Sequence, residues 1–157
     1  NWSLPGRACQ HNLVYWENGP YLGVGPGAHS RLGDYRFWTI LSPREYNTKS
    51  HSWSESDPQL ANELTEAALQ TIHTLGGWEH ISLEIACSET MFLGLRLLDG
   101  LDLSEASART GTDLAKKFQT PIQECIDLGL LEQEGDCLKL TGPAYLIANQ
   151  AFTRFLE

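Results

Sequence analysis

The sequence predicts an α+β fold in which a turn-rich, strand-forming region precedes a mostly helical one. Residues 1–56 are rich in glycine, proline and aromatic residues, and they show little helical periodicity. Residues 57–157 carry closely spaced helix start and stop signals, with a hairpin pattern near their end. We therefore expect two domains, residues 1–56 and residues 57–157, the second of them winged-helix-like.

The first region contains two candidate strands. Residues 21–24 form a short apolar run between two turn sequences, which indicates a buried strand. Residues 35–41 alternate loosely between apolar and polar side chains and suggest a second strand. Residues 12–16 fit either a strand or a helical turn, and the serine-rich residues 50–57 indicate a loop.

The second region is predicted from its caps and apolar stripes. Asp57 and Pro58 suit the N-cap and first position of a helix. The expected elements, in order, are a helix over 57–75 ended by the glycines at 76 and 77, helices over 88–98 and 104–109, a helix that starts at Thr112 and restarts at the capping box of Thr120, a hairpin over 130–140, and a final helix after Thr141.

This order of helices and hairpin is that of a winged-helix domain, a fold that often binds DNA. The third helix offers only Lys116 and Lys117 as basic residues, and the hairpin carries Glu132, Glu134 and Asp136. The 157-residue chain has 11 Lys and Arg against 20 Asp and Glu, a formal charge of −9. Because such a surface repels phosphate, we expect no nucleic-acid partner.

Signals for a membrane span, for secretion and for a cysteine-held metal are missing from the sequence. No apolar run approaches the roughly 18 residues that span a bilayer, and no signal peptide is visible. The four cysteines, Cys9, Cys87, Cys125 and Cys137, include no CxxC pair, so no zinc or iron–sulfur signature is present. Their even number would fit disulfides in a secreted protein, but no secretion signal accompanies it. We therefore expect a cytoplasmic protein with free thiols and no transmembrane segment.

Two separated motifs resemble the HemW family of radical-SAM proteins. Residues 9–16 read CQHNLVYW, against a family pattern C-R-H-N-x-x-Y-W, and they depart from it at Gln10, where arginine is usual. Residues 21–30 read YLGVGPGAHS, which follows the family pattern Y-L-G-x-G-P-G-A-H-S. The match continues through 37–46 and returns at 89–96, ETMFLGLR, leaving roughly residues 50–87 unmatched.

The resemblance implies the C-terminal portion of a HemW-type protein, a relative of the oxygen-independent coproporphyrinogen III oxidases. Residues 1–56 are then expected to end an open (β/α) radical-SAM barrel, and residues 57–157 to form a domain of the HemN C-terminal type. The chain starts at Asn1 without Met and lacks the family's CxxxCxxC-type motif. A [4Fe–4S] cluster needs closely spaced thiolates, so we expect no cofactor and no radical chemistry in this portion alone.

For the full-length protein the resemblance implies three cofactors: a [4Fe–4S] cluster, S-adenosylmethionine and haem. The expected partners are the upstream barrel of the same protein, haem itself and haem-accepting proteins. The expected function is haem binding and delivery, which the H-N-x-x-Y-W motif favours. The alternatives are part of a coproporphyrinogen III oxidase, an enzyme of porphyrin biosynthesis, or a protein-interaction module that uses its acidic face. We assign no catalytic residue.

His11 is the candidate haem-iron ligand, because the family motif carries its candidate axial histidine at this position. A neutral imidazole nitrogen binds haem iron. Asn12, Tyr15 and Trp16 belong to the same candidate site, with the two aromatic rings as an apolar wall for the porphyrin. The alternative is that His11 and Asn12 bond the backbone while Tyr15 and Trp16 fill the core. Cys9 is a possible thiolate, although buried structural thiols are commoner.

Gly23, Gly25, Gly27 and His29 are expected to line a cofactor pocket, because glycine-rich turns after barrel strands usually face the active site. The segment also fits GxGxxA, but a proline removes one amide and no helix pattern follows, so we reject a dinucleotide site. The alternative is a tight turn in which glycines supply positive φ. A nucleophile–base pair of His29 and Ser30 lacks a third member.

Overall fold

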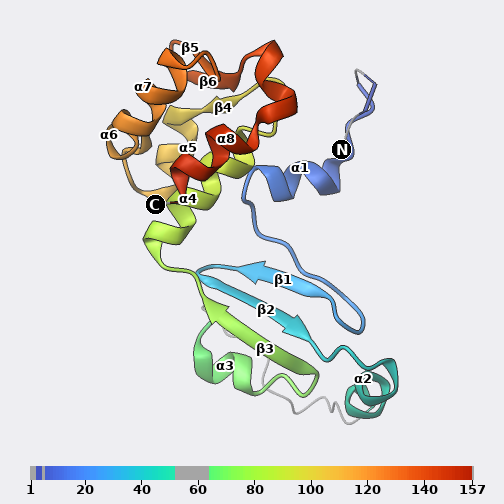
Figure 1. Cartoon of the computed structure of the whole chain (residues 1–157). Coiled ribbons are helices and arrows are strands. Elements are labelled where there is room, and N and C mark those ends of the chain that lie inside the picture. The colour runs from blue at the N-terminus through green and yellow to red at the C-terminus, as the bar shows by residue number, and fades with distance from the viewer. Residues whose placement is uncertain (1–2, 5, 52–63, 157) are drawn as a thin grey trace. The chain divides into compact units, whose positions relative to one another are not determined.

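The computed structural model describes residues 3–4, 6–51 and 64–156, a mixture of helices and sheets (Figure 1). It divides into two compact units, one of Asn1–Asn18 with Leu83–Glu157 and the other of Gly19–Ser82. The expected boundary at 56/57 falls outside the described residues. The units have different limits from the expected domains, because residues 75–80 pair with the strand at 35–39 and residues 10–16 pack near residues 83–94.

The unit of residues 19–82 is an antiparallel sheet with two short helices. Its strands lie in the order β1-β2-β3. The elements are β1 (His29–Leu32), β2 (Tyr35–Thr39), α2 (Pro43–Ser50), α3 (Glu66–Gln70) and β3 (Leu75–His80). The strand predicted at 35–41 is confirmed as β2. The strand predicted at 21–24 is wrong, because only Tyr21 forms a bridge, with Arg31 of β1.

The prediction of a helix over 57–75 is also wrong at its C-terminal end. Its start lies outside the described residues, as does most of the loop expected over 50–57, and α3 ends at Gln70. Gly76 and Gly77 do not follow a helix but lie within β3, where strand β2 approaches closely. A Cβ at Gly77 would lie 2.5 Å from the Trp38 ring, and one at Gly76 would lie 2.8 Å from the Thr39 carbonyl oxygen. These glycines therefore permit strand packing rather than ending a helix.

The other unit joins one N-terminal helix to a helical domain with a small sheet, whose strand order is β4-β6-β5. Its elements are α1 (Gln10–Trp16), α4 (Leu83–Gly94), β4 (Leu101–Asp102), α5 (Leu103–Thr110), α6 (Leu114–Lys117), α7 (Gln119–Asp127), β5 (Leu131–Glu134), β6 (Cys137–Leu140), the 3₁₀ helix η1 (Gly142–Ile147), α8 (Asn149–Phe152) and the 3₁₀ helix η2 (Thr153–Phe155). The predicted short helix and hairpin are confirmed as α5 and β5–β6.

Other boundaries in this unit differ from the prediction. The helix expected over 88–98 begins at Leu83, and residues 12–16 are helical. Asp113 rather than Thr112 caps α6, because its carboxylate accepts a hydrogen bond from the Lys116 amide at 3.0 Å. Helix α7 starts at Gln119 without a side-chain cap, so Thr120 is not its N-cap. The expected final helix is mostly 3₁₀.

Each unit has its own apolar interior. Phe37, Ile40, Leu69 and Ile81 are buried in the sheet unit. The core of the helical unit contains aliphatic and aromatic side chains from α4 to η2, with the Phe118 and Phe155 rings edge to face at 5.6 Å. All four cysteines are free, as predicted, and Cys87 and Cys125 are fully buried.

Candidate functional site

Helix α1 carries the first group of predicted site residues. It runs over seven residues, none of which is buried. His11 is exposed, whereas Asn12, Tyr15 and Trp16 are half-buried. His11 and Tyr15 are four residues apart and therefore lie on the same face of the helix. The four residues named from the sequence thus share one short, accessible helix.

The His11 ring is oriented by Tyr15. The Tyr15 Oη lies 3.1 Å from His11 Nε2, and the two rings meet edge to face with centroids 4.9 Å apart. Either the hydroxyl donates to Nε2 or the imidazole donates to the hydroxyl, depending on the tautomer. The exposed ring can therefore bind a metal through Nδ1, or through Nε2 once the hydroxyl moves aside.

The backbone alternative for His11 and Asn12 is not what the structure shows. His11 bonds a side chain, and across the described residues no hydrogen bond of the Asn12 side chain is found. The asparagine that anchors α1 is Asn18, which the sequence did not single out. Its Nδ2 donates to Thr90 Oγ1 at 3.1 Å and to the Ala86 carbonyl at 3.4 Å. Asn18 has φ 56°, a left-handed conformation that asparagine tolerates, and it ties the end of α1 to α4.

Trp16 packs on Arg96, a residue that follows α4. The Arg96 guanidinium carbon lies 5.4 Å from the Trp16 ring centroid and 4.6 Å from that of Phe152. Trp16 therefore serves at least in part to join α1 to the helical unit, as the packing alternative expected. Arg96 belongs to the 89–96 motif, but sequence reasoning assigned it no role.

The glycine-rich segment before β1 is a tight turn held by β2. The Ala28 amide donates to Thr39 Oγ1 at 3.0 Å, and that hydroxyl donates to the Gly25 carbonyl at 2.5 Å. The Gly27 amide donates to the Ile40 carbonyl at 2.9 Å. Gly25 and Gly27 have φ of 108° and 70°, which favours glycine. The Gly27 and Ala28 amides thus bond within the unit, as the turn alternative expected, and are not available to hold a phosphate.

Gly23 shows a related close approach. Its amide donates to Ser30 Oγ at 3.0 Å, and a Cβ there would lie 2.2 Å from the His29 carbonyl oxygen. Ser30 is 1% exposed, while the neighbouring His29 is exposed. Adjacent strand residues point to opposite faces of a sheet. His29 and Ser30 therefore do not present a nucleophile and base to one substrate.

A pocket of about 560 Å³ lies between β2, β3 and α2. The His29 and Trp38 rings flank it, tilted by 31° with centroids 5.7 Å apart. Lys49 and Glu45, paired at 3.1 Å, contribute opposite charges to its lining. Gly27 and His29 line this pocket, whereas Gly23 and Gly25 do not. Its aromatic and charged lining suits a flat ligand with polar groups at its edge.

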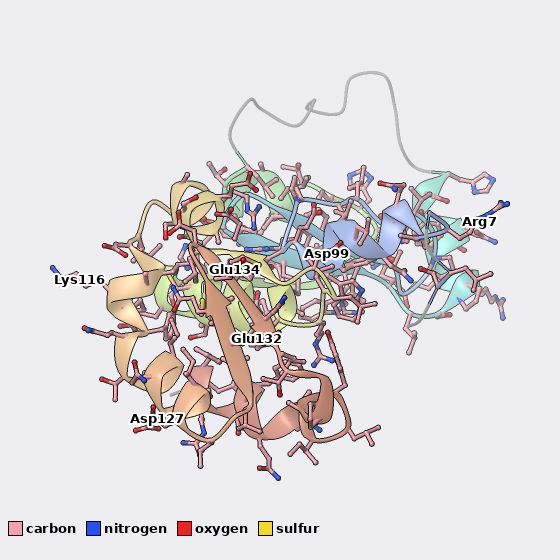
Figure 2. All side chains as sticks on the ribbon, turned by 90° about the horizontal axis from the view of Figure 1, so that it is seen from above. Arg7, Asp99, Lys116, Asp127, Glu132 and Glu134 are labelled. Carbon is pink, nitrogen blue, oxygen red and sulfur yellow. The ribbon has the colours of Figure 1, made fainter. Side chains whose placement is uncertain are left out.

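The hairpin of the helical unit is acidic, as the sequence indicated. Figure 2 shows Glu132 and Glu134 along β5, with Lys116 pointing outward from α6. Lys139 pairs with Glu132 at 3.4 Å, and Glu134 is exposed. In the part of the chain that the structure describes, no helix has the length and apolar character needed to cross a membrane.

Comparison with known proteins places these features in a family. Residues 81–147 match the family model described as the HemN C-terminal domain. The heme chaperone HemW of Mycobacterium tuberculosis is 33% identical over 149 residues, which are 95% of this chain and 32% of that protein. The chain belongs to the HemW family. The family resemblance drawn from the motifs at 9–16 and 21–30 is thereby confirmed.

Other relatives agree with this HemW-type assignment. The heme chaperone HemW of Bacillus subtilis is 26% identical over 156 residues, 99% of this chain and 36% of that protein. The chain thus spans about a third of the length of these curated relatives. The solved radical-SAM coproporphyrinogen III oxidase HemN of Escherichia coli has a similar fold. Its TM-score is 0.57 at 16% identity, over 87% of this chain and 28% of that one.

Proposed function

We propose that this chain supplies haem-binding residues to a HemW-type haem chaperone, with His11 as the iron ligand. The observation that carries the proposal is an exposed imidazole, held at 3.1 Å by Tyr15 on a helix anchored to α4. A partner on one ring nitrogen fixes the orientation of a ligating histidine. The HemW relatives named as heme chaperones make haem the cargo that this imidazole would bind.

The two remaining cofactors belong, in this proposal, to the full-length protein. Family membership implies a [4Fe–4S] cluster and S-adenosylmethionine there. The described residues do not fit the cluster, because among them no group of three or more His, Cys, Asp or Glu is placed to hold a metal. The pocket beside Gly27 and His29 fits S-adenosylmethionine better than it fits a cluster. The His29 and Trp38 rings suit the purine of that molecule, and the Lys49–Glu45 pair suits its zwitterionic amino-acid end. Its role would be to bind and orient that molecule.

The finer fold description is part of the same proposal. We propose that residues 1–56 adjoin the end of the open radical-SAM barrel, although their strands β1 and β2 pair antiparallel rather than parallel. We also propose that the helical unit is winged-helix-like. The winged-helix-like assignment is supported by the order of the elements along the chain, which is α4, β4, α5, α6, α7, β5, β6. It is also supported by the order of the strands in the sheet, β4-β6-β5. The acidic hairpin favours a structural or protein-binding role over DNA binding.

Haem titration of the full-length protein tests the function, with the Soret band as readout. We expect His11→Ala to weaken haem binding by about tenfold or more, because one iron–imidazole bond is lost. His51→Ala removes another exposed histidine and serves as the matched control, with no expected effect. Unchanged haem affinity and an unchanged Soret band in His11→Ala would exclude the assignment. Turnover of coproporphyrinogen III by the full-length protein would instead favour the oxidase alternative, whose support is the similar fold of HemN.

A further inference from the structure

Arg96 is a cation whose surroundings are aromatic. The residue follows α4, where its amide donates to the Leu93 carbonyl at 3.0 Å. Trp16 and Phe152 place their rings 5.4 Å and 4.6 Å from its guanidinium carbon. Cation–π contacts hold the charge through the ring faces and leave the five N–H donors of the guanidinium for other partners.

No acidic side chain uses those donors in the described part of the chain. Ion pairs join Arg36 to Glu79 and Arg154 to Glu124, but across residues 3–4, 6–51 and 64–156 none involves Arg96. This is notable in a chain with nine more acidic than basic residues, where a carboxylate partner is easily supplied. Arg96 is also exposed to solvent. Its guanidinium is thus oriented, accessible and able to take a carboxylate in a bidentate manner.

The position of Arg96 connects it to the candidate haem ligand. Trp16, which contacts Arg96, lies on α1 five residues after His11, a separation of about 7.5 Å along the helix axis. The helix is anchored to α4 by the bond from Asn18 to Thr90, and Figure 1 shows α1 beside α4. The imidazole of His11 and the guanidinium of Arg96 are therefore carried by one packed unit, and Trp16 links the helix of the first to the second.

We propose that Arg96, held by Trp16 and Phe152, binds a propionate carboxylate of the tetrapyrrole whose iron His11 binds. The inference rests on the proposed haem function and adds the group that recognises the edge of the ligand. Trp16 and Phe152 then act as positioning residues, because they fix the guanidinium. The ligand class is a porphyrin with free carboxylates, as opposed to an esterified or wholly apolar ring.

The test compares two metal-free ligands in the full-length protein: protoporphyrin IX and its dimethyl ester, both in the same low concentration of detergent. Fluorescence titration gives the Kd of each. We expect Arg96→Met to weaken protoporphyrin binding by about tenfold and to leave ester binding unchanged, because only the free acid has a carboxylate for Arg96. Arg96→Lys keeps the charge without the planar fork, so its loss should be smaller.

Arg109→Met, which removes an exposed arginine on α5, is the matched control and should bind both ligands normally. An equal loss for acid and ester in Arg96→Met would show a packing role and overturn the inference, as would no loss for either. The result of the Arg96 experiment can be distinguished from the result of the His11 experiment, because the two use different ligands. His11→Ala should weaken haem binding but not metal-free porphyrin, so an Arg96 effect without a His11 effect would reject only the iron ligand.

Discussion

At the scale of single residues, burial decides which side chains are chemically available. His11 and Cys9 are exposed at the start of α1, whereas Cys87 and Cys125 are fully buried among apolar neighbours. Burial raises the pKa of the Cys125 thiol, and the positive charge of Arg154 lowers it by less. Since the thiolate is the nucleophile, residues with the same side chain should differ widely in reactivity.

Thiol labelling checks this difference. With an aromatic disulfide reagent near pH 8, we expect Cys9 to react at least about tenfold faster than Cys125, which needs unfolding to become accessible. Cys9→Ser should remove the fast phase alone, as peptide mass spectrometry of the labelled sites can show. Labelling of Cys125 at the rate of Cys9 in the folded protein would contradict the burial of that thiol.

A single glycine sets the distance between two strands. A Cβ at Gly77 would overlap the rigid indole of Trp38 at 2.5 Å, so Gly77→Ala must displace the ring or the strand. We expect this change to lower the free energy of unfolding by about 1–3 kcal/mol. A Cβ at Gly142 would meet no atom within 4 Å, and Gly142→Ala is therefore the control. Urea denaturation followed by circular dichroism measures both, and equal midpoints would refute the packing argument.

At the scale of elements, short helices depend on their caps. Asp102 begins α5, and its carboxylate accepts hydrogen bonds from the Glu105 amide at 2.9 Å and the Ser104 hydroxyl at 2.7 Å. The Glu105 bond, and secondarily the Ser104 bond, hold the pKa of Asp102 below its ordinary value. A lowered pKa in the folded state means that the ionised cap stabilises the fold above the ordinary carboxyl pKa. That contribution disappears as the pH falls through the lowered pKa.

The pH dependence of this cap is therefore predictable. Asp102→Ala should lower the melting temperature at neutral pH, and the difference from the wild type should shrink as the pH falls below about 4. Asp102→Asn keeps an uncharged hydrogen-bond acceptor. Its melting temperature should lie between those of the wild type and Asp102→Ala, and should depend less on pH than that of the wild type. Thermal melts from pH 2 to pH 7 measure this, and a constant difference across that range would reject an ionised cap.

At the scale of the whole molecule, the described residues of each unit form an apolar interior of their own. The larger one lies wholly in the helical unit and contains Phe155, which is fully buried against Phe118. The smaller one includes Phe37 and Ile81 of the sheet unit. Because the two sets share no member, a loss of packing in one unit should be felt mainly there.

Phe155→Ala tests this separation. It should cost about 3–5 kcal/mol in the helical unit, since a large aromatic side chain leaves a cavity. Hydrogen exchange by mass spectrometry should then show faster exchange in α4 and in the β5–β6 hairpin, and little change in β1–β3. Phe152→Leu at the edge of the core is a milder comparison. Equal acceleration in both units would mean that they unfold as one.

Local patterns in the sequence predicted some features correctly because their causes are local. The hairpin at 130–140 follows from strand residues on either side of a tight turn, and the end of the helix at 104–109 from the glycine at 111. The motif around His11 named the family, but it left open whether residues 12–16 form a strand or the helix that the structure shows. These features depend on residues within a few positions of one another.

Only the tertiary structure decided the features that depend on distant residues. Gly76 and Gly77 have the composition of a helix stop, but the approach of Trp38 and Thr39 makes them part of a strand. Arg96 has no local signal of function, and its oriented guanidinium exists because Trp16 and Phe152 come from either end of the chain. A local pattern specifies turns, caps and motifs, whereas strand partners and aromatic contacts are chosen by burial across the folded chain.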